Sequence, residues 1–149
     1  VLALAGVQDA GNLGTLLRSA VAAGIREAWL DAKTAQAWSP KALRAGMGAH
    51  FNLRIEQGCE LVSRLGEDPR PCRVTCLEED SISLFELDLR APGVWVFGAE
   101  GQGVPAEIIS LASEKIAIPM PGRIESLNVS AAAAVCLFEA VRQRQISVR

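Results

Sequence analysis

The sequence has few of the residues from which metal sites and disulfide frameworks are built. It contains one histidine, His50, and its four cysteines form no CxxC pair. Because a structural zinc site needs several such ligands at close spacing, the composition predicts no metal centre. Cys72 and Cys76 are close enough in sequence to share one face of a strand. In a chain of 149 residues we nevertheless expect reduced, buried thiols that pack as small apolar groups, which points to a reducing cytoplasm.

Long apolar runs and a strong net charge are also absent. Every apolar stretch is interrupted by Gly, Glu or Arg well before the ~20 residues that a membrane-spanning helix needs, so we expect no transmembrane segment. The formal net charge of −2 gives no basic field over the whole chain. A nucleic acid would therefore have to be attracted by a local cluster of cations or by a further domain.

Short apolar runs alternate with helical patterns along the whole chain. The expected strands are Val1–Gly6, Glu27–Asp31, Phe51–Ile55, Arg73–Leu77, Val94–Phe97 and Lys115–Ile118, and the expected helices are Asn12–Ala23, Pro40–Ala45, Cys59–Leu65, Pro105–Ala112 and Leu127–Arg144. We expect Glu67–Pro71 and Glu78–Ser83 to be polar connections. The alternation predicts an α/β fold, with a mainly parallel sheet covered by helices on both faces and a ligand beyond the carboxyl ends of its strands.

The chain length fits one domain, because a domain of this size can bury roughly 70% of its unfolded surface. Val1 already lies inside a strand-like apolar run. We therefore expect residues 1–149 to be one domain of a longer protein, with any N-terminal domain absent.

The first candidate motif is a loop and amphipathic helix between Gln8 and Gly24. Asn12 is a suitable N-cap, and a core stripe follows at Leu13, Leu16, Leu17 and Ala20. Arg18 lies off that stripe, one turn after Gly14. Its side chain is expected to extend over the bare glycine backbone toward the helix N-terminus, where the two could hold a phosphate. The alternative is a solvated surface arginine.

The second candidate motif is an apolar strand, Val94–Phe97, that breaks into a glycine-rich turn and restarts as a helix near Pro105. Glycines let a ligand approach the backbone closely, and Glu100 places a carboxylate in the turn. Gly101–Ala106 also satisfies the loose G-x-G-x-x-A pattern of a dinucleotide site. However, it follows the fifth strand, and Arg123 stands where an acidic ribose ligand is expected. A plain strand–helix turn is the alternative.

The third candidate motif is the stretch from Ile118 to Ser130, which leads into a helix of almost unbroken alanine. Ser126 and Asn128 lie where the first helical turn leaves backbone N–H groups without partners. Ile118 and Leu127 are apolar walls suited to a flat heteroaromatic ring. The alternative is a capped core helix with no chemistry at its start.

Together these segments resemble the three motifs of the SpoU/TrmH family of RNA 2′-O-ribose methyltransferases, in the SPOUT class. The matching patterns are Asn12-x-Gly14-x-x-x-Arg18, Phe97-Gly-Ala-Glu-Gly-Gln-Gly103 and Ile118-Pro-Met-x-Gly122-x-x-x-Ser-Leu-Asn-Val-Ser130, and Ser39–His50 resembles the family's linking segment. The resemblance covers essentially all 149 residues and implies that they form a catalytic domain. It implies a C-terminal trefoil knot that topology rules would have rejected.

The resemblance also implies S-adenosylmethionine as cofactor and rRNA or tRNA as substrate. The implied cofactor-binding residues are Thr75, Gly98, Gly101, Ile118, Met120 and Leu127, and the implied catalytic residues are Asn12, Arg18, Glu100, Ser126 and Asn128. A homodimer is implied through the last helix, where Ala131–Ala134, Val135, Leu137 and Phe138 fit an interface. RNA specificity is expected in the absent N-terminal segment and in cations such as Lys41, Arg44, Arg54 and Arg123.

A permanently charged arginine is a poor base, so Arg18 is assigned to gripping a substrate phosphate and stabilising negative charge on the reacting oxygen. Glu100 and Asn128 would orient Arg18 and the hydroxyl, with Glu100, a phosphate or water as proton acceptor. Two alternatives remain at this point: a nicotinamide-dependent oxidoreductase, and a non-catalytic RNA-binding module of the same fold.

Overall fold

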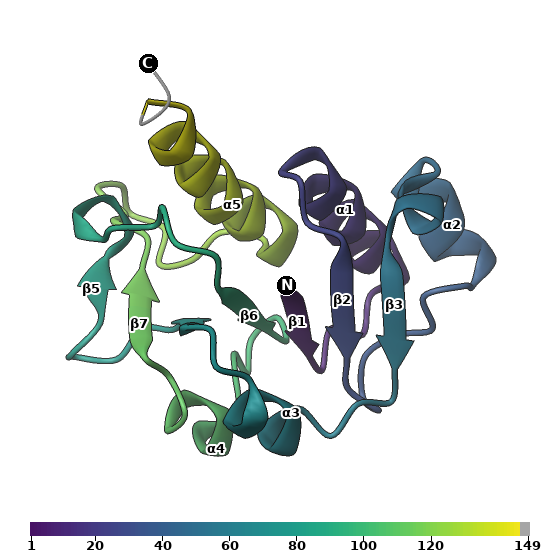
Figure 1. Ribbon diagram of the computed structural model, residues 1–149, viewed down its shortest axis with the longest axis horizontal. Helices are drawn as coiled ribbons and strands as arrows, with labels where there is room; N and C mark the ends of the chain where they lie inside the picture. The colour runs from purple at the N-terminus through teal and green to yellow at the C-terminus, as the bar shows by residue number, and fades with distance from the viewer. Residues whose placement is uncertain (147–149) are drawn as a thin grey trace.

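The computed structural model describes residues 1–146, which form a seven-stranded sheet with helices on both faces (Figure 1). The strands run β3-β2-β1-β6-β4-β7-β5 across the sheet, and all neighbours are parallel. Their bounds are β1 Leu2–Ala5, β2 Glu27–Leu30, β3 Arg54–Gln57, β4 Cys72–Thr75, β5 Ile82–Ser83, β6 Val94–Gly98 and β7 Glu114–Ala117. The helices are α1 Ala10–Ala22, α2 Pro40–Gly46, α3 Leu61–Glu67, α4 Ala106–Ile109 and α5 Val129–Ile146, with 3₁₀ turns η1 Ala49–Asn52 and η2 Leu84–Glu86.

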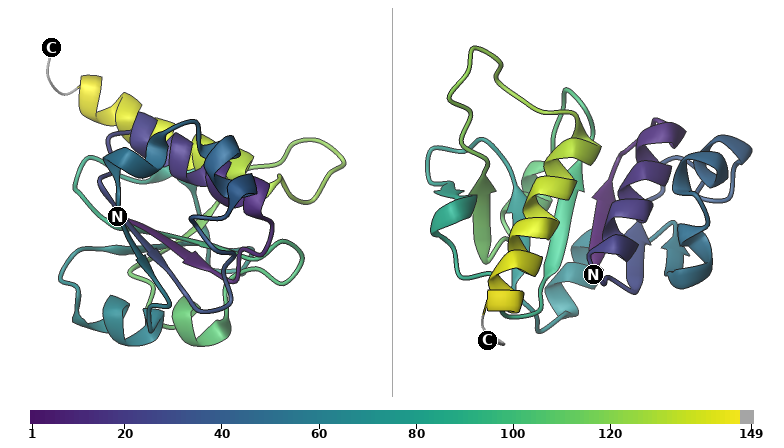
Figure 2. Two further views of the ribbon diagram at one scale, coloured as in Figure 1. Left: turned by 90° about the vertical axis from the view of Figure 1, so that its right-hand side faces the viewer. Right: turned by 90° about the horizontal axis from the view of Figure 1, so that it is seen from above.

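Two apolar cores lie on opposite faces of the sheet because side chains alternate along each strand. Leu2 and Leu4 of β1 pack into the core under α1 and α5, whereas Ala3 and Ala5 face the core under α3 and α4. Figure 2 shows α1, α2 and α5 on one side of the sheet and α3 and α4 on the other. The predicted α/β class, with a parallel sheet covered on both faces, is confirmed. The implied trefoil knot stays a prediction.

The prediction of a strand over Phe51–Ile55 is wrong in its first half. Phe51 belongs to η1, and β3 starts only at Arg54. Met47 and Gly48 both have positive φ, which ends α2 and reverses the chain. The His50 ring is then buried with its Nε2 2.7 Å from the Ala37 carbonyl oxygen, which fixes the 3₁₀ turn.

The connection expected at Glu78–Ser83 contains a short edge strand, β5. Ile82 pairs with Ile116 of β7. A strand of two residues is too short to produce an alternating pattern, so the sequence carries no periodic signal for it.

Helix α1 begins two residues earlier than predicted, because Asp9 rather than Asn12 is its N-cap. The Asp9 Oδ1 atom accepts a hydrogen bond of 2.8 Å from the Asn12 backbone N–H. The Asn12 side chain is thereby free for other contacts. The predicted core stripe at Leu13, Leu16, Leu17 and Ala20 is buried, as expected.

Helix α2 lies directly on α1 at Gly14. A Cβ atom at this position would lie 2.4 Å from the Ala42 carbonyl oxygen and 2.8 Å from the Gly46 nitrogen. The expected path of Arg18 over a bare Gly14 backbone is therefore wrong, since α2 covers that backbone. Arg18 is exposed instead.

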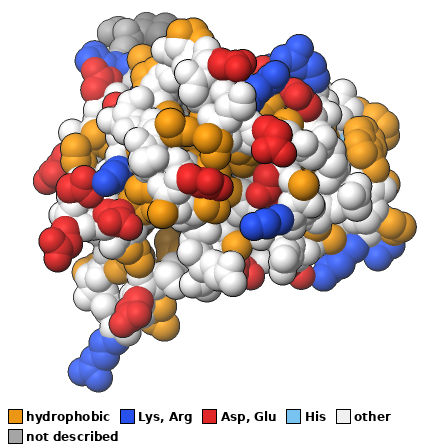
Figure 3. Space-filling model, turned by 90° about the horizontal axis from the view of Figure 1, so that it is seen from below, with side chains coloured by type: hydrophobic (Ala, Val, Ile, Leu, Met, Phe, Trp, Pro, Cys, Tyr) orange, Lys and Arg blue, Asp and Glu red, His pale blue; other side chains and the backbone are white. Residues whose placement is uncertain are grey.

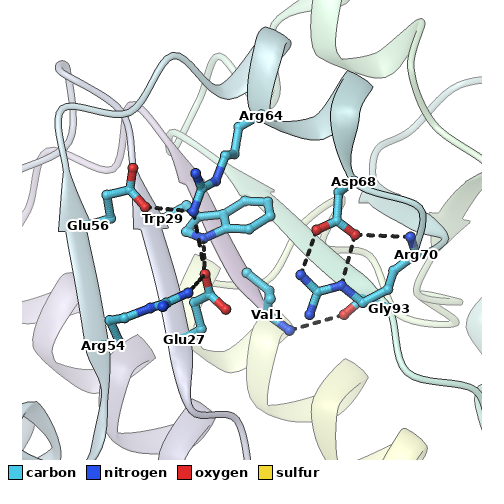
Figure 4. A network of polar contacts seen from close by, with 9 residues as sticks. All are labelled: Val1, Glu27, Trp29, Arg54, Glu56, Arg64, Asp68, Arg70 and Gly93. Atoms are coloured by element: carbon cyan, nitrogen blue, oxygen red, sulfur yellow. Dashed lines mark hydrogen bonds and ion pairs between the residues drawn. The ribbon is translucent and has the colours of Figure 1, made fainter.

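Charged side chains are interlocked at the amino ends of β2 and β3 (Figure 4). Arg54 donates a hydrogen bond of 2.6 Å to Glu27, and Arg64 pairs with Glu56 at 2.7 Å while stacking 4.7 Å from the Trp29 ring. Arg54 is thus held at the end of the sheet opposite to Lys41, which pairs with Asp9 just after β1. The two cations do not share one surface.

The four cysteines are free thiols, and Cys59, Cys72 and Cys136 are buried as predicted, whereas Cys76 is half-buried. Burial raises the pKa of the Cys72 thiol to about 11 and that of Cys136 to about 12. Both thiols therefore stay protonated and apolar at neutral pH. No helix within residues 1–146 is long and apolar enough to cross a membrane.

The contact between α1 and α2 predicts opposite effects for two glycine-to-alanine changes. Gly14→Ala should lower the free energy of unfolding by at least about 1 kcal/mol, because overpacking against the Ala42 backbone outweighs the gain in helix propensity. Gly66→Ala in α3, where a Cβ meets nothing within 4 Å, should raise it by about 0.5–1 kcal/mol. Urea unfolding of both variants measures the difference, and a stabilised Gly14→Ala protein would contradict the close packing.

Candidate active site

A groove of about 650 Å³ lies beyond the carboxyl ends of β4, β6 and β7. Two loops, 99–105 after β6 and 118–128 before α5, project on the same side of the molecule and form its walls (Figure 2). All six residues predicted to bind the cofactor line this groove: Thr75, Gly98, Gly101, Ile118, Met120 and Leu127. The structure therefore brings together residues that are up to 52 positions apart in the chain.

The turn after β6 folds back onto the end of its own strand. A Cβ atom at Gly98 would lie 2.2 Å from the Gly103 carbonyl carbon and 2.3 Å from the Val104 nitrogen. Gly101 and Gly103 have positive φ, and the Gly103 N–H donates to the Ala99 carbonyl oxygen at 2.8 Å. Residue 98 must therefore be glycine for the turn to close, whether or not a ligand also contacts it. The closed turn fixes the position of Glu100.

Three side chains, one from each motif, meet at the edge of the groove. The Glu100 Oε1 atom accepts hydrogen bonds of 2.9 Å from both Asn12 Nδ2 and Asn128 Nδ2. Asn128 Nδ2 also donates to Asn12 Oδ1 at 3.1 Å. Asn12, Glu100 and Asn128, here called the motif triad, bring distant regions of the chain together at one edge of the sheet.

Asn128 also holds the start of α5. Its Oδ1 atom accepts a hydrogen bond of 2.9 Å from the Ser130 backbone N–H and one of 2.5 Å from the Ser130 hydroxyl. Because the oxygen serves as the cap, the amide nitrogen must face Glu100. The Glu100 carboxylate lies near the N-terminal ends of α1 and α5, where the helix dipoles favour negative charge.

Ser126 lines the groove together with Glu100 and Asn128, whereas Arg18 does not. Arg18 lies one turn after Gly14, on the side of α1 that borders α2. Within residues 1–146 it makes no hydrogen bond or ion pair. The predicted anion site between Arg18 and the N-terminal amides of its own helix stays a prediction, and it would lie outside the groove.

The outer surface of α5 carries an apolar stripe. Ala131, Val135 and Phe138 are exposed at a spacing of four and three residues, so they lie on one face. Ala133 and Leu137, which were also expected at an interface, are buried in the core of the chain itself. That part of the prediction is wrong.

The sequence analysis missed the ion pair between Asp9 and Lys41, which supports the start of α1 and therefore Asn12. Lys41 Nζ lies 3.0 Å from Asp9 Oδ2, and Asp9 in turn caps the helix that carries Asn12. Hydrogen bonding to the Asn12 backbone and then to Lys41 lowers the Asp9 pKa, so this carboxylate stays charged. A signal was present, since Asp9 is itself a preferred N-cap residue three positions before Asn12.

The sequence matches the family model of the SpoU rRNA methylase family over residues 1–138. The chain belongs to this family. It is 38% identical over 148 residues to the 23S rRNA (guanosine-2′-O-)-methyltransferase RlmB of Xylella fastidiosa, covering 98% of this chain and 59% of that protein. It is 37% identical over 145 residues to an uncharacterized tRNA/rRNA methyltransferase of Synechocystis, covering 96% and 53%. The chain thus spans just over half the length of these relatives.

Solved structures of the SpoU family have the same fold. An AdoMet-bound rRNA methyltransferase from Sinorhizobium meliloti superposes with a TM-score of 0.87 at 35% identity, covering 95% of this chain and 55% of that one. The TrmH/SpoU tRNA modifying enzyme of A. aeolicus gives 0.87 at 32% identity, covering 99% and 76%. Family membership favours methyl transfer over the nicotinamide alternative that Gly101–Ala106 raised. No group of three or more His, Cys, Asp or Glu side chains within residues 1–146 is placed to hold a metal ion.

The double role of Asn128 predicts a graded loss of stability. Asn128→Ala should lower the free energy of unfolding by about 0.5–2 kcal/mol, because α5 loses its cap. Asn128→Ser keeps a capping oxygen but no amide for Glu100, so it should recover most of that loss. Chemical unfolding of the two variants measures the difference; equal stability of Asn128→Ala and the parent would show that the cap contributes nothing.

Proposed function

We propose that this chain is the catalytic domain of an enzyme that transfers a methyl group from S-adenosylmethionine to a ribose 2′-hydroxyl of rRNA or tRNA. The observation that carries the proposal is the motif triad at the edge of the groove. The RlmB relatives are 23S rRNA (guanosine-2′-O-)-methyltransferases by name. Structures of relatives have been solved with AdoMet bound, which supports the same chemistry here.

The groove suits the cofactor in size and lining. Its volume of about 650 Å³ is within the usual range for a small-molecule site. Ile118, Met120 and Leu127 supply apolar walls for an adenine ring, and backbone groups near Gly98 and Gly101 supply hydrogen-bonding partners. When bound there, S-adenosylmethionine supplies an electrophilic methyl group.

Glu100 is proposed to orient the ribose hydroxyl and accept its proton. Its Oε1 atom is occupied by the two amides of the triad, whereas Oε2 has no hydrogen-bonding partner within residues 1–146. Two fixed donors leave the carboxylate little freedom to rotate, so Oε2 is held ready for a hydroxyl. Holding the reacting atoms in line is worth roughly 7–11 kcal/mol of the barrier when the geometry is well fixed. Ser126, which lines the groove from the opposite loop, is proposed to contact the substrate.

Arg18 is proposed to grip an RNA phosphate next to the reacting nucleotide. Because it lies outside the groove of its own chain, it would act on RNA that extends beyond the groove or on RNA at the site of a second subunit. We propose a homodimer in which the α5 stripe of Ala131, Val135 and Phe138 is covered by the same helix of the partner. A cytoplasmic location fits such a substrate.

Loss of the Glu100 carboxylate should separate catalysis from cofactor binding. Glu100→Gln retains an oxygen for the two asparagine amides but is a far weaker proton acceptor, so methyl transfer should fall by about 100-fold or more. The measurement is incorporation of labelled methyl groups into RNA by the full-length protein, with cofactor affinity from calorimetry as the control. Cofactor binding without any transfer by the parent protein, to total rRNA or tRNA, would refute the proposed activity.

Arg18→Ala should lower kcat by about 100-fold or more, because the contact with the phosphate positions the reacting nucleotide. Cofactor affinity should stay within about twofold, because Arg18 does not line the groove. Arg18→Lys keeps the charge but not the planar fork, and should recover only part of the rate. Unchanged turnover by Arg18→Ala would remove this residue from the mechanism.

A further inference from the structure

One segment of this weakly acidic chain carries cations only. Residues 32–55 contain Lys33, Lys41, Arg44 and Arg54 and no acidic residue, although the net charge of the whole chain is −2. Arg54 is bound by Glu27 at the amino end of the sheet. Lys33 and Arg44, by contrast, make no ion pair within residues 1–146, so their charges are available to a polyanion.

The same segment exposes large apolar side chains just before α2, just after it and on η1. Phe51 is 86% exposed, Met47 71% and Trp38 54%. Figure 3 views the molecule from the side of α3 and α4, and at its right-hand edge, toward β3, hydrophobic and basic side chains lie next to each other. Met47 is also the only non-glycine residue within residues 1–146 with a positive φ, a backbone conformation that a glycine would adopt with less strain. The fold itself does not require a large side chain there.

The exposed aromatic at the start of α2 rests on a rigid base. The Trp38 ring lies 5.2 Å from the ring of His50, which is buried and held to the Ala37 carbonyl oxygen. Helix α2 is fixed in turn by its contact with Gly14 of α1. A ring supported in this way loses little freedom when a flat ligand stacks on it.

Two contacts link this surface to the motif triad at the edge of the groove. Lys41 at the start of α2 pairs with Asp9, and Asp9 accepts a hydrogen bond from the backbone of Asn12, a member of the motif triad. A strand whose reacting nucleotide lies in the groove can therefore continue over the start of α2.

We propose that the outer surface of α2 and η1, formed by Trp38, Arg44, Met47 and Phe51 and here called the α2 platform, binds a single-stranded segment of the substrate RNA next to the methylated nucleotide. The inference rests on the proposed function. Exposed aromatic rings stack on unpaired bases, and unpaired cations beside them bind the phosphates, which is the pattern of single-strand recognition. The absence of acidic residues from this segment favours RNA over a protein partner.

Trp38 provides a direct optical test. Within this chain the other two tryptophans, Trp29 and Trp95, are each only 2% exposed, so the part of a fluorescence change that is lost in a Trp38→Phe variant reports on Trp38. A 12-nucleotide oligouridylate should quench the fluorescence of the full-length protein, and a duplex RNA of the same length should quench it much less. Trp38→Phe should remove the Trp38 part of this change, and its phenyl ring should preserve part of the stacking and therefore part of the affinity. Quenching of equal size by both RNAs, or none by either, would overturn the platform.

Affinity measurements provide the second test. Phe51→Ala should weaken oligouridylate binding by about 5- to 150-fold, the usual effect of removing one stacking partner. Arg44→Ala should weaken it and reduce the salt dependence by about one phosphate contact. Phe85→Ala is the matched control, since Phe85 is 58% exposed on η2, outside the platform, and this change should leave RNA affinity unaltered. Phe51 and Arg44 are exposed, so their removal should not prevent folding.

The outcomes separate this inference from the proposed function. Methyl transfer that needs Glu100 but is unaffected in rate and KM by Phe51→Ala and Arg44→Ala would overturn the platform and leave the function standing. Quenching and weakened binding without any cofactor binding would support the platform and refute the function. If Phe51→Ala instead changes the oligomeric state in sedimentation and leaves RNA affinity unaltered, the surface is a protein contact and the inference is wrong.

Discussion

The structure of the site depends on one shared acceptor, the Oε1 atom of Glu100. Two asparagine amides from the N-terminal turns of different helices converge on it, so the starts of α1 and α5 and the turn after β6 are tied together. None of these contacts is individually strong, since a single hydrogen bond contributes about 1 kcal/mol to stability, or more when one partner is charged. Their value is geometric, because they fix a carboxylate within a loop that would otherwise be free to move.

Two further contacts hold this arrangement in place. The Gly98 backbone allows the turn to fold onto its own strand, and the Gly14 backbone allows α2 to pack tightly against α1. In both cases the absence of a side chain serves the packing of the chain itself. Asp9 and Lys41 then connect the start of α1 to α2. The groove is thus bordered by elements that are fixed from outside, as a site that must position two reactants requires.

The sequence predicted a ligand site beyond the carboxyl ends of the strands, because parallel strands present these ends at one edge of the sheet. The members of the triad followed only from the family resemblance. The sequence could not decide between Asp9 and Asn12 as the N-cap, since both residue types are preferred there. The position of Arg18 was missed for a different reason. The lean of a helical side chain is a local rule, and nothing local reveals that α2 already covers Gly14. Helix α5 is apolar on nearly every side from Val129 to Phe138, so periodicity could not separate buried Leu137 from exposed Phe138.

The separation of the triad along the chain has a consequence for how the protein folds. Asn12 and Asn128 are 116 positions apart, and the loop between their contacts encloses most of the sheet. Long-range contacts of this kind form late, because the entropy of closing the loop is lost before the contact stabilises it. Since Asn128 begins α5, the strands of the sheet can pair before the edge that carries the motif triad is complete. Assembly of the site is therefore a late event, coupled to the docking of α5.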